Sequence, residues 1–491
     1  MSDRGGGTSR PPGRMAAQLV LIVVGMLLAL QADAWVSPLS DRAEGEGGAQ
    51  PPSAAWVDAL DEMMSELHER SWFNGAVVLS RGGEPVYEGG WGWANLEEEA
   101  PFSPDTPVDG GSIAKTFAAA TLWMLVEEGR VALDDPVVNR LPAYPHPGTT
   151  LRHLLSHSGG LPDYLAFDSL FDQVVTTRRM LEHLGGSQPA FPPGSRFRYC
   201  NLCFDVVATV VEEVTGTSWP EFFRERILLP LSMDSAFVRP ALLSDLPGGR
   251  TLSYRTGPEG LHLHDVFDGE GFYGGSNLYL SARDLQRWSD AWFLQPVLGP
   301  EARGAGSALG RVGYPPAATG LSLLNWYGDG GGGVHYTGYH QGFYVMAWRN
   351  PGTGLSVVHV SNASIPQEVV PLFTRALIAA LEGRAFTVPD RPSWSPIPET
   401  PHREVLAGSW IMGSGRSEVI LRGAGEDSAP GGIFRIRAGD GAEYDAFPAG
   451  ERVLYVPGLD WWLGFSGLGG EGEVTLHLEA VRHSDTGRRR W

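Results

Sequence analysis

The strongest constraint on the fold of this chain is a helix that is apolar on every side. Residues 112–128 have helical spacing, and between Phe117 and Val126 only Thr121 is polar. A helix on a protein surface needs a polar face toward water, so a helix without one must be buried. Other elements therefore have to surround it. A chain of 491 residues, of which 42% are hydrophobic, is long enough for a large domain around this helix and a second, smaller domain.

Ser112 and Lys115 stand at the beginning of this helix and form the candidate catalytic pair. A spacing of three residues places the hydroxyl and the amine on the same helical face. The preceding Gly110 and Gly111 permit a close backbone approach, and the helix N-terminus favours a developing oxyanion. Burial and this field lower the pKa of a lysine, and a neutral lysine can accept the proton of a serine hydroxyl. The pattern predicts a serine nucleophile with a lysine base.

Lys115 is also the only lysine among the 37 lysine and arginine residues of the chain. A guanidinium does not lose its proton in the working range of an enzyme, so arginine could not replace a lysine that acts as a base. This distribution supports the catalytic interpretation of S-x-x-K, a pattern that is common by itself in long chains.

Two further segments carry candidate site residues. Tyr199 and Asn201 lie in a predicted loop before a helix over 204–214. A phenol can relay a proton, and an amide can hold a substrate carbonyl. Taken alone, a tyrosine or an asparagine in a loop is more often a turn or surface residue.

The second of these segments is Tyr336-Thr337-Gly338, at the head of a strand predicted over 335–348. A glycine permits a substrate to lie flat against a strand, and the following amide, that of Tyr339, can donate to an oxyanion. These residues are therefore candidates for substrate binding.

Four segments together resemble the serine β-lactamase, penicillin-binding protein and related esterase superfamily, and the resemblance covers residues 55–385. The segments are Ser112–Pro136, Leu151–Tyr164, Pro193–Asn201 and Gly342–Asn362. The resemblance implies an α/β (α+β) fold of the β-lactamase/transpeptidase-like type, in which an antiparallel sheet is flanked by helices and joined to an all-helical lobe.

The resemblance also implies a role for each candidate residue. Ser112 is acylated, Lys115 is its base, Tyr199 takes part in proton transfer to the leaving group, and Asn201 orients the substrate. The amides of Ser112 and Tyr339 form the oxyanion hole.

Other parts of the resembling segments are expected to support the site. We expect His153 and His157 to be structural, and the turn over 271–284 to pack beneath the site. The sequence contains no His-Glu-x-x-His motif, and we expect no metal and no cofactor.

The chain departs from the family at Tyr336, where the family usually has lysine or sometimes histidine. Loss of this cation disfavours substrates that carry a carboxylate, such as β-lactams and D-alanyl peptides. Esters or amides without that carboxylate are favoured instead. His340 shares strand parity with Tyr336, so it is expected to face the pocket, bind substrate and restore a charge.

The candidate residues are compatible with three functions. The first is a serine hydrolase that acts on a small ester, amide or peptide through an acyl-enzyme. The second is a non-catalytic binding or scaffold protein of the same fold, and the third is a cell-wall D-alanyl peptidase or β-lactamase. A net charge of -20, with no basic cluster longer than the three arginines at 488–490, argues against nucleic acid as a partner.

The ends of the chain suggest export and a second domain. Arg10 and Arg14 precede an apolar run and small residues that end at Ala34, so 1–34 is predicted to be a signal peptide or an uncleaved membrane anchor. The protein is then periplasmic or secreted. The remaining predicted segments are a flexible lead over 35–54, a proline-rich linker over 386–402, and a small all-β barrel or sandwich over 403–491.

Cys200 and Cys203 are the only cysteines, so no disulfide framework is expected to hold the fold. Their C-x-x-C spacing occurs in redox and metal motifs, but a second cysteine pair and a thioredoxin-like pattern are absent. We interpret them as small buried apolar residues beside the site, with metal or redox use as the alternative.

Overall fold

The computed structural model describes residues 53–162 and 174–388, apart from gaps at 186, 196–197, 249, 258–259, 266–269, 295–296, 308–326, 329–332, 341 and 364–369, and the strands beyond residue 407. The predicted signal peptide lies outside the described residues, as do nearly all of the flexible lead and the linker. The chain divides near Arg391 into two compact units. None of the described helices is long and apolar enough to cross a membrane.

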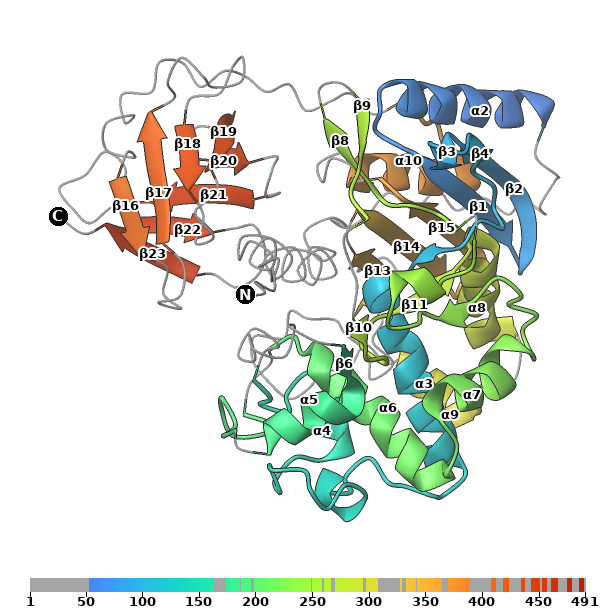
Figure 1. Ribbon diagram of the computed structural model, residues 1–491. Coiled ribbons are helices and arrows are strands. Elements are labelled where there is room, and N and C mark those ends of the chain that lie inside the picture. The colour runs from blue at the N-terminus through green and yellow to red at the C-terminus, as the bar shows by residue number, and fades with distance from the viewer. Residues whose placement is uncertain are drawn as a thin grey trace, which may run out of the picture. The chain divides into compact units, whose positions relative to one another are not determined.

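The larger unit is built on a six-stranded antiparallel sheet of order β12-β13-β14-β15-β1-β2 (Figure 1). The strands are β1 (Gly75–Arg81), β2 (Glu84–Trp91), β12 (Tyr327–Gly328), β13 (Val334–His340), β14 (Phe343–Asn350) and β15 (Leu355–Ser361). The prediction of one strand over 335–348 was wrong. Gly342 has a φ of +94° and turns the chain, and a Cβ there would lie 2.6 Å from the carbonyl oxygen of Tyr254.

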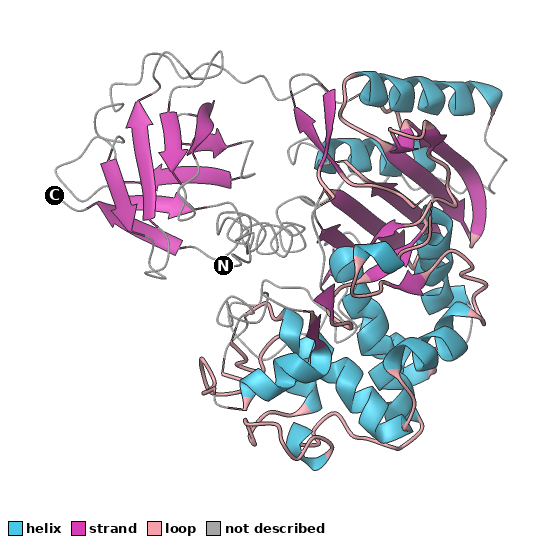
Figure 2. Ribbon diagram, viewed as in Figure 1, coloured by secondary structure: helices cyan, strands magenta, loops and turns pink. Residues whose placement is uncertain are grey.

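Helices cover both faces of this sheet (Figure 2). On one face, α2 (Ala54–Glu69) and α10 (Val370–Leu381) bury a core that includes Met64, Val77 and Val357. On the other face, Asp290 of α8 (Ala282–Leu294) contacts Ser80 of β1 and Arg349 of β14. The arrangement is the predicted sheet flanked by helices.

The apolar helix is α3 (Ala114–Glu127), and every residue from Ala114 to Leu125 is buried, as predicted. Phe117 stacks on Trp288 of α8 with ring centroids 4.3 Å apart. The hydroxyl of Thr121, the single polar residue in the apolar stretch, accepts a hydrogen bond of 3.0 Å from the indole of Trp219. A buried hydroxyl is thereby satisfied, as packing without water requires.

Helices α3, α4, α5, α6, α7 and α9 form the predicted helical lobe. Their bounds, with those of four single turns, are α4 (Leu151–Leu155), α5 (Thr177–Leu184), α6 (Asn201–Thr215), α7 (Trp219–Phe223), α9 (Pro300–Ser307), η2 (Gly111–Ile113), η3 (Val137–Asn139), η5 (Arg224–Leu228) and η6 (Leu243–Asp245). Helix α6 ends where Gly216 adopts a φ of +73°, the left-handed cap that the sequence predicted.

Short strands complete the larger unit. They are β3 (Trp93–Asn95), β4 (Ala100–Pro101), β5 (Val108–Asp109), β6 (Val175–Thr176), β7 (Phe237–Val238), β8 (Tyr254–Gly257), β9 (Gly260–Leu263), β10 (Glu270–Gly271) and β11 (Leu278–Leu280). Strand β11 lies between β5 and β7, and β5 leads directly into the turn that carries Ser112.

The smaller unit is a closed antiparallel barrel, one of the two predicted architectures. Its strands are β16 (Gly408–Ile411), β17 (Glu418–Gly423), β18 (Phe434–Arg437), β19 (Glu443–Gly450), β20 (Val453–Val456), β21 (Trp461–Ser466), β22 (Thr475–Leu478) and β23 (Asp485–Arg489). Strand β16 pairs with β23, which closes the barrel without a free edge.

Candidate active site

The sequence predicted a regular helix from Ser112 onward, but Ser112 lies in the 3₁₀ turn η2, two residues before that helix begins. Helix α3 begins only at Ala114. Gly111 has a φ of +50°, and a Cβ on it would lie 2.5 Å from the carbonyl oxygen of Tyr339. A Cβ on Gly338 would lie 1.8 Å from the carbonyl oxygen of Gly110. Glycines on both sides therefore let strand β13 approach the turn that carries the serine.

The hydroxyl of Ser112 is bonded by the two side chains that the sequence assigned to catalysis. Lys115 Nζ lies 3.1 Å from Ser112 Oγ, and the Tyr199 hydroxyl donates to the same oxygen at 2.9 Å. The exposed fractions of Ser112, Lys115 and Tyr199 are 4%, 0% and 6%. The fold thus brings a hydroxyl, an amine and a phenol from two distant segments into one buried cluster.

Burial lowers the pKa of Lys115 from 10.5 to about 7, and the carboxylate of Asp205 opposes this effect. Lys115 Nζ also donates to the carbonyl oxygen of Gly275 at 2.5 Å, and Asp205 Oδ1 accepts the Gly275 amide at 2.9 Å. The turn over 271–284, which we expected to pack beneath the site, therefore contacts Lys115 directly.

Asp205 was missed in the sequence. It lies on α6 four residues after Asn201, and this spacing places the two residues on one helical face. The signal available in the sequence was that Asp205 is the only charged residue between positions 201 and 211.

The phenol of Tyr199 is a proton donor in this site. Burial raises its pKa well above the ordinary value of a tyrosine, against the opposing effect of its hydrogen bonds with Ser112 and Tyr336. The phenol therefore keeps its proton at neutral pH. The hydroxyls of Tyr199 and Tyr336 lie 3.4 Å apart, so Tyr336 continues the chain of hydroxyls that begins at Ser112.

The five predicted residues on β13 divide between the two faces of the sheet. The register pairs Tyr336 with Ala347 and Gly338 with Val345, on the face toward Ser112. Thr337 pairs with Met346, which belongs to the core under α2 and α10. The side chain of Thr337 therefore lies on the core face of the regular strand, and a part of Thr337 in substrate binding stays a prediction.

Tyr339 and His340 complete the strand. The Tyr339 side chain belongs to the core on the far face, while its backbone is close to Gly111. Nδ1 of His340 lies 2.9 Å from Oδ2 of Asp109, so the charge of a protonated His340 is balanced by a carboxylate. His340 shares the face of Tyr336 and Gly338, as its strand parity predicted, and its part in substrate binding stays a prediction.

Asp109 links β13 to the serine turn. Its Oδ1 accepts the Gly111 amide at 2.9 Å, while Oδ2 contacts His340 and, at 3.7 Å, Nε of Arg239. Burial alone would raise the pKa of Asp109, but His340 and Arg239 hold it below its usual range. The carboxylate stays ionised and fixes the backbone two residues after it.

Asn201 is the first residue of α6 and not a loop residue as predicted. It is buried, and a Cβ on Gly275 would lie 2.8 Å from its carbonyl oxygen. Asn201 therefore lies against the same turn that contacts Lys115.

Cys200 and Cys203 form a disulfide, which corrects their interpretation as two separate apolar residues. Cys200 is the extended residue before α6, and this conformation places its Cα 5.4 Å from that of Cys203, within the range that a disulfide spans. The bridge begins directly after Tyr199 and encloses Asn201. Among the described residues, no group of three or more histidine, cysteine, aspartate or glutamate side chains could hold a metal ion.

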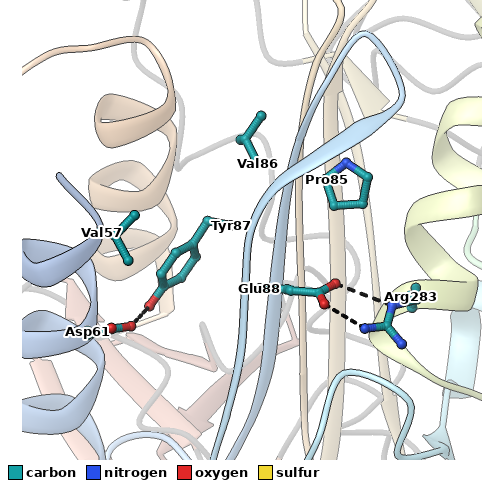
Figure 3. Close-up of a pocket in the computed structure, with 7 residues that line it drawn as sticks. All are labelled: Val57, Asp61, Pro85, Val86, Tyr87, Glu88 and Arg283. Carbon is teal, nitrogen blue, oxygen red and sulfur yellow. Dashed lines mark hydrogen bonds and ion pairs between the residues drawn. The ribbon is translucent and has the colours of Figure 1, made fainter. Parts of the chain in front are cut away.

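A pocket of about 590 Å³ lies between α2 and β2 and is unrelated to this site (Figure 3). Asp61, Tyr87, Glu88 and Arg283 line it, and they are joined in pairs by a hydrogen bond and an ion pair. Strand β2 is the edge strand, four strands away from β13 in the sheet order. The pocket contains none of the candidate catalytic residues.

Comparison with known proteins places residues 60–381 in a match to the family model described as Beta-lactamase. A penicillin-binding protein of Bacillus subtilis strain 168 is 25% identical over 363 residues, which cover 68% of this chain and 78% of the relative. The esterase EstB of Burkholderia gladioli is 28% identical over 395 residues, which cover 67% of this chain and 95% of the relative.

A solved structure supports the fold. The D-amino acid amidase of Ochrobactrum anthropi SV3, in complex with D-phenylalanine, superposes with a TM-score of 0.56 at 19% identity, over 67% of this chain and 98% of the amidase.

Proposed function

Because the chain belongs to the β-lactamase family, whose members include serine hydrolases that act on esters and amides, we propose that it hydrolyses an ester or amide through a covalent acyl-enzyme on Ser112. The observation that carries the proposal is the contact of Ser112 Oγ with both Lys115 Nζ and the Tyr199 hydroxyl. Lys115, with a pKa of about 7, can accept a proton near neutral pH, and Tyr199, whose pKa is raised, holds a proton that it can donate.

Acylation follows from these proton positions. Neutral Lys115 accepts the proton of Ser112 as Oγ attacks the substrate carbonyl carbon. The negative charge on the carbonyl oxygen is stabilised by the amides of Ser112 and Tyr339. As the tetrahedral intermediate collapses, the bond to the leaving group breaks, and the leaving alcohol or amine takes the Tyr199 proton. The proton held by Lys115 then restores the phenol.

Deacylation uses the same groups in reverse. A water molecule attacks the acyl carbon and gives a proton to the pair formed by Lys115 and Tyr199. This pair returns a proton to the Ser112 oxygen as that oxygen leaves and the acid is released. Both steps require the close approach of β13 to Ser112, because the Tyr339 amide must reach the oxyanion.

Tyr336 supports a substrate without a carboxylate next to the reacting carbonyl. Its neutral phenol, fully buried beside Tyr199, stands where a cation would bind that carboxylate. His340 lies on the same face, where the Asp109 carboxylate balances the charge of a protonated imidazole. We therefore favour a neutral ester or amide over a β-lactam or a D-alanyl peptide.

The proposal includes that the protein acts on its substrate outside the cytoplasm. The predicted signal over 1–34 supports export to the periplasm or the medium. Fractionation of cells that express the full chain, followed by sequencing of the mature N-terminus, tests this. An N-terminus near Trp35 supports cleavage, an intact N-terminus in the membrane fraction supports an anchor, and recovery from the cytosol contradicts export.

Labelling with a fluorophosphonate probe and turnover of short-chain nitrophenyl esters test the activity. We expect the wild-type chain to be labelled and to turn over ester, and Ser112→Ala and Lys115→Arg to lose both. Ser244→Ala, at an exposed serine of η6, is the matched control and should behave as wild type. Labelling of Ser112→Ala contradicts the assignment, and labelling of wild type without turnover supports a binding protein instead.

A further inference from the structure

We propose that His157 is a positioning residue that orients the Tyr199 phenol for proton transfer to the leaving group. The proposal rests on the function proposed above. His157 follows α4 in the segment 151–164, where the sequence suggested a purely structural histidine. Three separate contacts, two to the backbone and one to the ring, join it to Tyr199 and its neighbours.

His157 binds the backbone on both sides of Tyr199. Its carbonyl oxygen accepts the amide of Arg198 at 2.9 Å, and its ring nitrogen Nδ1 accepts the amide of Cys200 at 2.9 Å. The positions of the residues before and after Tyr199 are therefore both set by one residue.

The imidazole also sets the plane of the phenol. The rings of His157 and Tyr199 are stacked, with centroids 4.7 Å apart and an angle of 17° between their planes. The imidazole is fully buried, and the ring of Phe204 lies 5.0 Å from it. Packing of this kind limits rotation of both rings.

The backbone of His157 makes these contacts compatible. His157 has a φ of +53°, a left-handed conformation in which histidine, asparagine and aspartate are enriched among residues other than glycine. The conformation ends α4 and turns the carbonyl and the ring toward the same segment.

The hydrogen bond from the Cys200 amide determines which nitrogen of the His157 imidazole carries a proton. Since Nδ1 accepts an amide proton, Nδ1 carries no proton of its own, and the ring proton resides on Nε2. A neutral His157 is not a second base for Ser112. Its contribution is to hold the Tyr199 hydroxyl 2.9 Å from Ser112 Oγ, and misplacement of a reacting group by about 1 Å can cost roughly 100-fold in rate.

Two esters of the same acid separate this role from a merely structural one. A nitrophenolate leaves without a proton, whereas an ethoxide must receive one, so only the ethyl ester depends fully on Tyr199. The value of kcat/KM reports acylation for each ester. Misorientation of Tyr199 lowers kcat/KM for the ethyl ester more than for the nitrophenyl ester, while a general loss of folded enzyme lowers both equally.

Three substitutions separate the contacts of His157. His157→Leu removes the acceptor and the ring, His157→Phe keeps a stacked ring, and His157→Asn keeps an acceptor near the position of Nδ1 and tolerates positive φ. The matched control is His153→Asn. His153 Nδ1 likewise accepts a backbone amide, that of Thr150 at 3.2 Å, but within the cap of α4.

We expect His157→Leu to lower the ethyl-ester kcat/KM about tenfold or more beyond its effect on the nitrophenyl ester. His157→Asn should recover most of this loss, His157→Phe should lie between them, and His153→Asn should leave the ratio of the two esters at the wild-type value. In a Tyr199→Phe background, His157→Leu should have no further effect on the ratio.

Equal losses on both esters in every His157 variant, or the same change of ratio in His153→Asn, overturn the proposal. Circular dichroism and fluorophosphonate labelling report whether each variant is folded, and the Asn and Phe variants decide the matter if the Leu variant is not. A wild-type chain that hydrolyses neither ester refutes the proposed function, a result distinct from an unchanged ratio in an active enzyme.

Discussion

Replacement of Lys115 by methionine should stabilise the larger unit while abolishing turnover. The amine is fully buried, and its pKa falls from 10.5 to about 7 because burial penalises its charged form. This fall corresponds to a free-energy cost of about 5 kcal/mol for the charged amine in the folded state. Methionine has a similar length and no charge, so it fits the site without that cost.

The gain in stability must depend on pH in a defined direction. The folded chain releases the Lys115 proton near pH 7, whereas the unfolded chain holds it until about pH 10.5. Between these values the unfolded state binds more protons, so the wild-type chain becomes more stable as the pH rises. The full cost applies below pH 7, and the advantage of Lys115→Met should shrink by about 3 kcal/mol between about pH 6 and about pH 9.

Urea unfolding of the full chain, followed by pulse proteolysis so that the two units are resolved, measures this difference. Methionine leaves Asp205 without its neighbouring cation, so Lys115→Met/Asp205→Asn is the control. The free energies of unfolding of Lys115→Met and of Lys115→Met/Asp205→Asn should differ by an amount that does not change between about pH 6 and about pH 9. A stability difference between wild type and Lys115→Met that is independent of pH would refute the reasoning, because it would show that the buried amine does not titrate near neutrality.

Three further predictions concern activity. The acidic limb of the pH profile of kcat/KM should have an apparent pKa of about 7. The rate falls as the pH falls, because protonated Lys115 cannot accept the Ser112 proton. An acidic limb below pH 5 would contradict this assignment. Asp205→Asn should move that limb to lower pH, since it removes the carboxylate that raises the Lys115 pKa but keeps an acceptor for the Gly275 amide; an unchanged limb in the same pH series would exclude Asp205 as its determinant. Gly338→Ala should lower kcat/KM by about 100-fold, because the added methyl would lie 1.8 Å from the Gly110 carbonyl oxygen and move β13 away from Ser112. Wild-type kinetics in this variant would show that the close approach of β13 to Ser112 is not required.

The sequence predicted the features that repeat locally or carry unusual residues. The buried helix followed from its composition, and the pairing of Ser112 with Lys115 followed from their spacing and from the rarity of lysine. Tyr199 was identified through the resemblance, and the structure brings it to Ser112 from 87 positions away. The sheet and the helical lobe were expected because of the family resemblance, and the all-β end because of its short alternating runs between glycine-rich turns.

The features that escaped prediction depend on register and on contacts between distant segments. Thr337 was placed in the site by its motif, whereas the pairing of β13 with β14 puts it on the core face. Asp205 and His157 act through the backbone of Gly275 and Cys200, and backbone partners leave no pattern in a single sequence. The disulfide required knowledge that Cys200 is extended before α6.

The Cys200–Cys203 bridge has a consequence for how the enzyme matures. A bridge between residues three positions apart removes little freedom from the unfolded chain, so it cannot hold the domain together. The bridge constrains only the start of α6, where it encloses Asn201 directly after Tyr199. Thiols stay reduced in the cytosol and oxidise outside it. A chain that follows the proposed export route therefore acquires this bond, which lies next to Tyr199, only after it has left the cytosol.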